Sequence, residues 1–461
     1  MGRGVSCLLG ACAFVVAGVL TPNQAFAAID IPTIALLTGC MMLSAHAEKA
    51  GLHVWLTRAL ASGATPLSLL IRISIVSALS SALITNDTTC IVLTPLVVDA
   101  ARSARRSPLP FLVALATAAN IGSALSPVGN PQNMIIAMMG KLRFFQFLYV
   151  ITLASILGLI LNAFVIMKIY SLEMNTQLIL DGDMELPNPK VCPITAAVQV
   201  KPQGSPITTA ALGKPEAKGM LHPITSEAPI IIIAQPAPTT KTATSAAAHD
   251  AATVATATAN RRRQIILGIL SIVPLFLIFA DLWIGLVWAV LLAAALVFAI
   301  DGEPPAPLLA RVDANLLFFF AGLFICTAGL NATGLPAAAW AALAPYASLD
   351  NLAGLAVFTT LVVVGSNTVS NVPLVLLLAP ALTTLSAADA RRACLVLAWT
   401  STVGGNFTLL GAVANVIVAE RARAEGVSMT FFGWLRAGVP STVLILFVGT
   451  PLVWMIANLS E

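Results

Sequence analysis

Long apolar runs, separated by short polar interruptions, dominate the pattern of this chain. An apolar run needs roughly 20 residues to cross a bilayer as an α-helix. The runs that approach this length, some only with their flanks, are residues 5–20, 29–45, 144–167, 265–281, 282–300, 316–330 and 439–456. The pattern therefore predicts an all-α polytopic membrane protein.

The composition agrees with this prediction and narrows the chemistry. Hydrophobic residues make up 58% of the chain and charged residues 10%, and the mean hydropathy is +0.93. A soluble protein has about 25% charged residues. The four His and seven Cys show no CxxC or Cys/His ligand spacing, so we expect no metal centre and no cofactor. The net charge of +4 is spread over loops, which gives no reason to expect nucleic acid as a partner.

The first 30 residues allow two interpretations. Arg3, an apolar core and the sequence Ala25-Phe26-Ala27 fit a secretory signal peptide with its cleavage site. The alternative is a first membrane helix. We favour the helix because another apolar run follows at once, from residue 29.

The two halves of the chain repeat each other. A shift of 285 residues aligns Asn86 with Asn371, Pro95 with Pro380, and Asn130 with Asn415. Upstream, a shift of 283 aligns residues 29–43 with 312–326, and downstream a shift of 287 aligns 144–150 with 431–437. Three sets of matches in the same order indicate a tandem repeat, with small differences in loop length.

This repetition predicts two membrane repeats joined by a linker. The linker is rich in Ala, Thr and Pro and has the composition of a disordered segment. Each repeat is expected to contain a re-entrant hairpin and a broken transmembrane helix. The predicted boundaries are 1–170 for the first repeat (hairpin about 66–100, broken helix about 107–140), 171–260 for the linker, and 261–461 for the second repeat (hairpin about 352–385, broken helix about 391–424).

Positive charge orients these repeats in the membrane. If each half is a span, a hairpin, a broken span and a closing span, one side receives fourteen Lys and Arg and the other receives four. The richer side is expected to be cytoplasmic, which places the N-terminus and the linker there and the chain in the cytoplasmic (inner) membrane. The same topology has an odd number of crossings between Asp30 and its counterpart Asp313, so the second repeat is inverted. Secondary transporters with inverted repeats bind substrate near the midplane between them.

Four polar segments interrupt the apolar sequence, two in each half. They are residues 81–95 and 120–133 in the first half, and 365–380 and 402–415 in the second. Non-helical backbone at membrane depth must be buried in protein or line a cavity, because lipid cannot satisfy its hydrogen bonds. The helix ends created there offer N–H groups to an anion and carbonyl groups to a cation. Since none of the segments contains Lys or Arg, an anion would be held by amides and helix dipoles, and a neutral solute could also be accommodated.

Asp87 breaks the symmetry between the halves. Its counterpart under the 285-residue shift is Val372, so only one hairpin tip carries a carboxylate. An ionisable residue at membrane depth is a functional candidate, and Asp87 could bind Na⁺ or carry a proton. The alternative is a structural role as a cap of the second hairpin helix.

At these residues the sequence resembles the arsenite-permease and citrate-permease-like branch of the ion transporter superfamily, which also contains the sodium-coupled dicarboxylate carriers. The resemblance rests on four ordered motifs: TNDTTCIVLTPLV from residue 85, ANIGSALSPVGNPQNMIIA from 119, SNTVSNVPLVLLLAP from 366 and GGNFTLLGAVANVIVAE from 404. It covers residues 29–461 apart from the linker. It implies a scaffold domain and a moving transport domain.

The resemblance also implies the residues of the site. The expected substrate-binding residues are Asn86, Thr88, Gly129 and Asn130 in the first half, and Ser366, Asn367, Thr368, Asn371, Asn406 and Asn415 in the second. Asp87 and Ser126 are expected to bind the coupling cation. One departure is the run 265–281, which has no counterpart in the first half.

We therefore expect an ion-coupled secondary transporter that moves a small anion, a carboxylate or an inorganic oxyanion, by alternating access, with Na⁺ or H⁺ as the coupling ion. Arsenite or antimonite efflux and Na⁺/H⁺ antiport are alternatives within the superfamily, and a passive channel is the alternative from another class. The chain has no HExxH or GxSxG motif, so we expect no enzyme activity.

The expected partners are the small anion and the lipid bilayer. The sequence leaves a homodimer open. Because the chain lacks a GxxxxGK[ST] motif, an arsenite pump would need a separate ATPase subunit.

Overall fold

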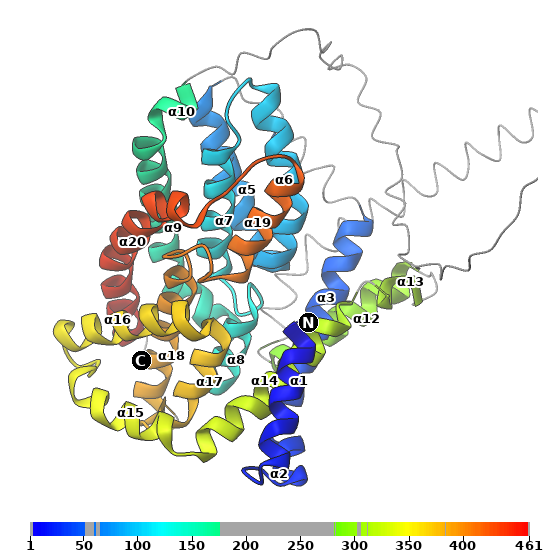
Figure 1. The fold of residues 1–461 in the computed structure, drawn as a ribbon, viewed down its shortest axis with the longest axis vertical. Coiled ribbons are helices and arrows are strands. Elements are labelled where there is room, and N and C mark those ends of the chain that lie inside the picture. The colour runs from blue at the N-terminus through cyan, green and yellow to red at the C-terminus, as the bar shows by residue number, and fades with distance from the viewer. Residues whose placement is uncertain are drawn as a thin grey trace, which may run out of the picture. The chain divides into compact units, whose positions relative to one another are not determined.

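The computed structural model describes residues 3–50, 60, 65–175, 281, 283–301, 306–310, 312–382 and 384–459. These residues form helices joined by turns, without a β-strand among them (Figure 1). In chain order the helices are α1 (Arg3–Val16), α2 (Pro22–Ala27), α3 (Ile31–Lys49), α5 (Pro66–Ile84), α6 (Asn86–Ser103), α7 (Leu109–Ser123), α8 (Pro131–Met139), α9 (Phe144–Ile169), α10 (Ser171–Asn175), α12 (Leu286–Asp301), α13 (Ala306–Leu309), α14 (Ala314–Ala332), α15 (Leu335–Leu343), the 3₁₀ turn η1 (Ala344–Tyr346), α16 (Leu352–Val369), α17 (Asn371–Leu382), α18 (Ala387–Gly404), α19 (Val413–Ala424) and α20 (Phe431–Leu459). Apart from α10 and Asp281, the predicted linker and the run 265–281 lie outside the described residues.

Several of these helices have the length and composition of membrane spans. The helical segments long and apolar enough to cross are Pro66–Leu83, Phe144–Ile169, Ala314–Ala332, Leu352–Val369 and Phe431–Leu459. On α9, Phe145 and Ile160 are each 59% exposed, whereas Phe147 and Ile151 are fully buried. A helix that is apolar on its exposed face as well as on its packed face is suited to lipid. The fold is that of a polytopic α-helical membrane protein, as the apolar runs predict.

Four helices pack on a helix of the opposite half. The 283-residue shift maps α1 onto α12 and α3 onto α14, yet α1 packs on α14 and α12 packs on α3 (Figure 1). Glycine allows these close approaches: a Cβ at Gly322 would lie 3.0 Å from the carbonyl carbon of Cys7, and one at Gly39 would lie 2.8 Å from Val290. Residues 3–16, which by sequence also fit a signal peptide, thus form a helix packed on the second repeat.

Both hairpins reverse direction at one residue with a strained backbone. Between α5 and α6 this is Thr85, with φ 94°, and between α16 and α17 it is Ser370, with φ 75°. The two positions are 285 residues apart, which is the repeat shift. A non-glycine residue rarely adopts positive φ, and such strain persists where the surrounding structure holds it. We call Thr85–Thr88 the first tip and Ser370–Asn371 the second tip.

The second tip is narrower than the sequence suggests. The polar residues of its motif begin at Ser366, but Ser366, Asn367 and Thr368 belong to the last turns of α16. The reason is local: apart from Gly354 and Gly365, the residues from Leu352 to Val369 are compatible with a helix, and only the reversal at Ser370 stops it.

Each repeat also contains an interrupted helix. The first break, residues 124–130, separates α7 from α8, and the second break, residues 405–412, separates α18 from α19. Next to the first break, α7 touches the first hairpin arm α5: a Cβ at Gly122 would lie 2.3 Å from the Cα of Ala78. Backbone-to-backbone contact of this kind requires glycine.

The closing helices α9 and α20 pack on each other and join the repeats. Between them lies Trp399 of α18, which is fully buried; Gly158 of α9 and Gly449 of α20 both face its ring. Asp281 accepts the backbone N–H of Phe144 at 2.6 Å and so satisfies a donor at the start of α9.

The topology predicted from the charges can be tested by labelling. In a variant without native cysteines, a Cys at Ala104, directly after α6, should react with a membrane-impermeant maleimide only from the cytoplasmic side. A Cys at Ala388, in the first turn of α18, should react only from the opposite side. The measurement compares intact cells with inverted vesicles. Labelling of both positions from one side would contradict the inverted arrangement.

Candidate functional site

The first tip is hydrogen-bonded to the first break. The backbone N–H of Asn86 donates to the carbonyl of Gly129 at 2.9 Å, and Asn86 is only 7% exposed. Gly129 has no room for a side chain, because a Cβ would lie 2.3 Å from the carbonyl oxygen of Ser123. Thr88 is held within the tip, where its N–H donates to Thr85 Oγ1 at 3.4 Å and its hydroxyl accepts from the same oxygen at 3.1 Å. Tip and break of the first repeat are therefore one connected unit.

Asn130 begins α8 and connects the first break to the second repeat. Its Oδ1 accepts the N–H of Asn133 at 2.8 Å, which caps the helix. Its Nδ2 donates to Ser123 Oγ at 3.0 Å and to Thr402 Oγ1 at 3.3 Å. Ser126 Oγ accepts the backbone N–H two residues further on at 3.2 Å. These side chains shape the break through bonds within the protein.

Asn367 connects α16 to the second break. Its Nδ2 donates to the carbonyl of Gly404 at 2.9 Å, and its Oδ1 accepts from both the N–H and the hydroxyl of Thr408, at 3.2 and 2.8 Å. Gly411 lies so close that a Cβ there would be 2.1 Å from Asn367 Oδ1. The structure thus brings Asn367 to the break although it lies outside the second tip.

Ser366 and Thr368 bond to their own helix. The hydroxyl of Ser366 donates to the carbonyl of Val363 at 3.1 Å, and that of Thr368 donates to Val364 at 2.7 Å. Thr368 is also exposed, whereas Ser366 is fully buried. The Thr368 hydroxyl is therefore not brought to the break, whereas Ser366 Oγ lies beside Gly404 and accepts from Asn367 Nδ2 at 3.4 Å.

Asn371 is the counterpart of Asn86 but is bonded differently. The Oδ1 of Asn86 accepts the N–H of Asp87 at 2.9 Å. The Oδ1 of Asn371 is buried and has no hydrogen-bond partner among the described residues, although the residue is only 7% exposed. Its side chain lies next to Gly405 in the second break. A buried acceptor without a partner is costly unless something else donates to it, so Asn371 Oδ1 is available to a ligand.

The site includes an asparagine that our sequence-based prediction left out. Asn120, in α7 and 1% exposed, accepts from Asn86 Nδ2 at 3.0 Å and donates to Oδ1 of Asn406 at 2.7 Å and of Asn415 at 3.0 Å. Comparing the halves could not identify it, because its counterpart at the 285-residue shift is Gly405. The available signal was its position at the start of the polar segment 120–133.

Thr402 of α18 is a second residue missed by sequence. Its hydroxyl accepts from Gln132 Nε2 at 3.1 Å and from Asn130, and donates to Asn133 Oδ1 at 3.2 Å. Its counterpart in the first half, Thr117 of α7, accepts from Asn406 Nδ2 through its carbonyl at 3.2 Å. The first break and the start of α8 are thus hydrogen-bonded to α18, and the second break is hydrogen-bonded to α7.

The electrostatics of the site come from helix ends and one carboxylate. The helices α6, α8, α17 and α19 begin at the tips and breaks, and their amino ends carry partial positive charge. Asp87, in the first turn of α6, is the one carboxylate in the four polar segments, which contain no Lys or Arg. Among the described residues, no group of His, Cys, Asp and Glu is placed to hold a metal ion.

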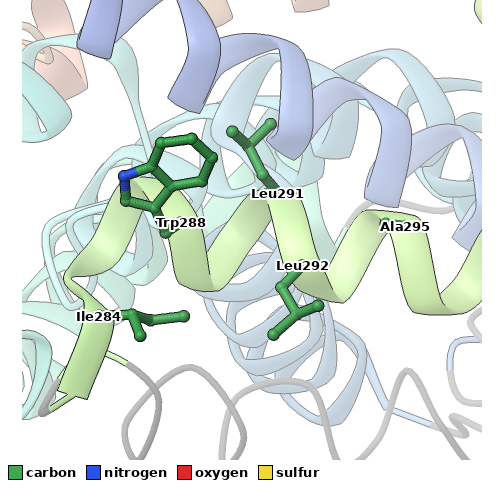
Figure 2. Close-up of a pocket in the computed structure, with 5 residues that line it drawn as sticks. All are labelled: Ile284, Trp288, Leu291, Leu292 and Ala295. Atoms are coloured by element: carbon green, nitrogen blue, oxygen red, sulfur yellow. The ribbon is translucent and has the colours of Figure 1, made fainter.

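A groove on α12 is less suited to bind a small polar solute than the tips and breaks are. Figure 2 shows its lining side chains, Ile284, Trp288, Leu291, Leu292 and Ala295. All five are apolar, and α12 packs chiefly on α3. Binding a small polar solute needs convergent polar groups, which are found at the tips and breaks.

Comparison with known proteins gives matches over most of the chain. Residues 1–404 match the family described as "Citrate transporter". The chain is 34% identical to the silicon efflux transporter LSI3 of Oryza sativa subsp. japonica over 466 residues, covering 98% of this chain and 92% of that protein. It is 30% identical to the putative transporter arsB of Dictyostelium discoideum over 500 residues, covering 99% and 88%.

A solved structure has a similar fold. It is the crystal structure of the YdaH transporter of Alcanivorax borkumensis, described as having an unusual topology. The TM-score is 0.50 at 16% sequence identity, and the match covers 97% of this chain and 88% of that chain. Since the sequences have diverged so far, this likeness concerns the fold alone.

Proposed function

The chain belongs to the citrate transporter family, and from that premise we propose that it is an ion-coupled secondary transporter of a small inorganic oxyacid or its anion. Membership of the family confirms the resemblance inferred from the four motifs, and the chain is a transporter rather than an enzyme. Because one relative is named a silicon efflux transporter, an oxyacid of silicon is the first candidate substrate, and an oxyacid of arsenic is the second.

The observation that carries the proposal is that carboxamides gather at the tips and breaks, where Asp87 is the one charged side chain. A small oxyacid has both O–H donors and oxygen acceptors, which carboxamides and helix N–H groups can match without a fixed charge. Asn371 Oδ1, buried and without a partner among the described residues, suits an O–H donor. A dicarboxylate or tricarboxylate is usually bound with Arg or Lys, which the four polar segments lack.

Asp87 supports the proposed ion coupling. It lies at the first tip, half-buried, in the first turn of α6, where a carboxylate can take up Na⁺ or a proton. Because the first tip is bonded to the first break through Asn86 and Gly129, binding of a cation there would affect the same elements that hold the solute. The change between outward-facing and inward-facing states would then require both the cation and the solute to be bound.

Citrate or another carboxylate is the alternative substrate class, favoured by the description of the family. The amino ends of α6, α8, α17 and α19 could hold carboxylate groups through backbone N–H donors. A test must therefore compare the two substrate classes directly.

The test is uptake into proteoliposomes containing the full chain. Silicic acid, arsenite, citrate and succinate are supplied in turn, with Na⁺ and pH gradients imposed separately and protein-free liposomes as the control. We expect saturable, gradient-dependent uptake of silicic acid or arsenite. Uptake of the carboxylates alone would show that the substrate is a carboxylate and not an oxyacid. Na⁺/H⁺ exchange without solute would indicate an antiporter. A flux that rises linearly with concentration would indicate a channel.

A further inference from the structure

Four buried carboxamides join the two repeats in one hydrogen-bonded network. We call Asn86, Asn120, Asn406 and Asn415 the asparagine network. Asn120 is its centre, since it accepts from Asn86 in the first tip and donates to the other two in and after the second break. Asn120, Asn406 and Asn415 are each at most 1% exposed, so water cannot replace these bonds freely.

The direction of every bond in this network is determined by backbone carbonyl groups. Asn406 Nδ2 donates to the carbonyl of Thr117 at 3.2 Å, and Asn415 Nδ2 donates to the carbonyls of Gly405 and Thr408 at 2.9 and 3.2 Å. A carbonyl oxygen only accepts, so neither amide can be turned round without placing two oxygens against each other. Their Oδ1 atoms must therefore face Asn120, which has to present Nδ2 to both.

The same direction continues to the first tip. With Nδ2 committed, Asn120 presents Oδ1, which accepts from Asn86 Nδ2. Asn86 then presents its own Oδ1, which accepts the backbone N–H of Asp87 at 2.9 Å. The orientation of Asn86 and the position of the Asp87 amide thus depend on the second break, although the two lie in opposite halves of the sequence.

We propose that Asn120 is a positioning residue that holds the first tip in register with the second break, so that solute binding at the break and cation binding at Asp87 are energetically linked. The linkage of solute and cation rests on the function proposed above, whereas the positioning of the tip does not. Asn120 itself has both polar atoms committed to the network and does not need to contact the solute.

Two substitutions separate positioning from packing. Asn120→Asp keeps the size of the side chain but removes both N–H donors and places a carboxylate against two amide oxygens that cannot turn away. Asn120→Ala removes the side chain and leaves its three partners without their bond. The matched control is Asn162→Ala: Asn162 is also fully buried and bridges Thr117 Oγ1 and Ser441 Oγ at 2.8 and 2.7 Å, but it reaches neither a tip nor a break.

Hydrogen–deuterium exchange on the purified full chain is the primary measurement, because it needs no substrate. In both Asn120 variants, the peptides containing Asp87 and residues 405–412 should exchange on the order of tenfold faster than in the wild type. In Asn162→Ala these two regions should keep wild-type rates. Wild-type rates at the tip and break in the Asn120 variants, or the same increase in the Asn162 control, would overturn the proposal.

Transport of silicic acid is the second measurement. After correction for the amount of inserted protein, Asn120→Asp should raise KM on the order of tenfold and reduce the effect of the imposed gradient on KM, while Asn162→Ala changes neither. If the exchange result is as expected but the wild type moves none of the offered solutes, the proposed function fails and the positioning role stands. An Asn120 variant with wild-type KM and gradient dependence would overturn the linkage.

Discussion

Asp87→Asn should insert and still bind solute, but its transport should no longer respond to an imposed Na⁺ or pH gradient. The substitution preserves the shape of the side chain and removes its titratable negative charge. If Asp87 takes up the coupling cation or proton, accumulation of solute should fall to the level reached without any gradient. The measurement is uptake into proteoliposomes with and without each gradient.

The structure weakens the alternative that Asp87 is only a helix cap. The N-cap of α6 is Thr85, whose side chain accepts the N–H of Thr88, and Asp87 lies two residues after this cap, in the first turn of the helix. A carboxylate in the first turn contributes only about 0.3–1 kcal/mol through the helix dipole, so Asp87→Asn should leave the fold stable. Asp99→Asn, at the other end of the same helix, is the matched control and should keep the gradient response. Uptake by Asp87→Asn that follows the gradient as in the wild type would end the coupling hypothesis.

Asn371→Ala should lower the affinity for the transported solute about five- to a hundredfold, which corresponds to a cost of about 1–3 kcal/mol when a buried O–H of the solute is left without its acceptor. It should do so without lowering the unfolding temperature, because Asn371 Oδ1 has no partner among the described residues. Removing this side chain therefore breaks no hydrogen bond to Oδ1 that stabilises the fold. The two measurements are KM for uptake and the thermal unfolding of the purified chain.

Asn351→Ala provides the opposite case on the same hairpin. Asn351 caps α16 at the far end from the second tip, where its Oδ1 accepts the N–H of Gly354 at 2.8 Å. Its loss should cost about 1 kcal/mol of stability and leave KM unchanged. If Asn371→Ala instead behaved like Asn351→Ala, less stable with unaltered KM, Asn371 would be a structural residue of the tip.

The reversals and breaks could be located from sequence because they are set by local chemistry. Pro131 follows Asn130 at the start of α8, and Gly404 and Gly405 end α18. Residues of these types favour the starts and ends of helices. Under the 285-residue shift Ser370 is the counterpart of Thr85, and the structure gives both positive φ.

The sequence by itself therefore determined the helical membrane fold, the repeat and the segments at which helices end, since backbone hydrogen bonds and apolar length are properties of contiguous residues. Only the tertiary structure decided which side chains meet there. It paired α1 with α14 and α3 with α12 across the halves, directed the hydroxyls of Ser366 and Thr368 to their own helix, and made Asn120 the centre of a network whose other members lie 34 to 295 residues away. The physical reason is that the role of a buried carboxamide depends on the donors and acceptors that other helices present to it. The alignment of the two halves pairs Asn120 with Gly405 and therefore does not show these partners.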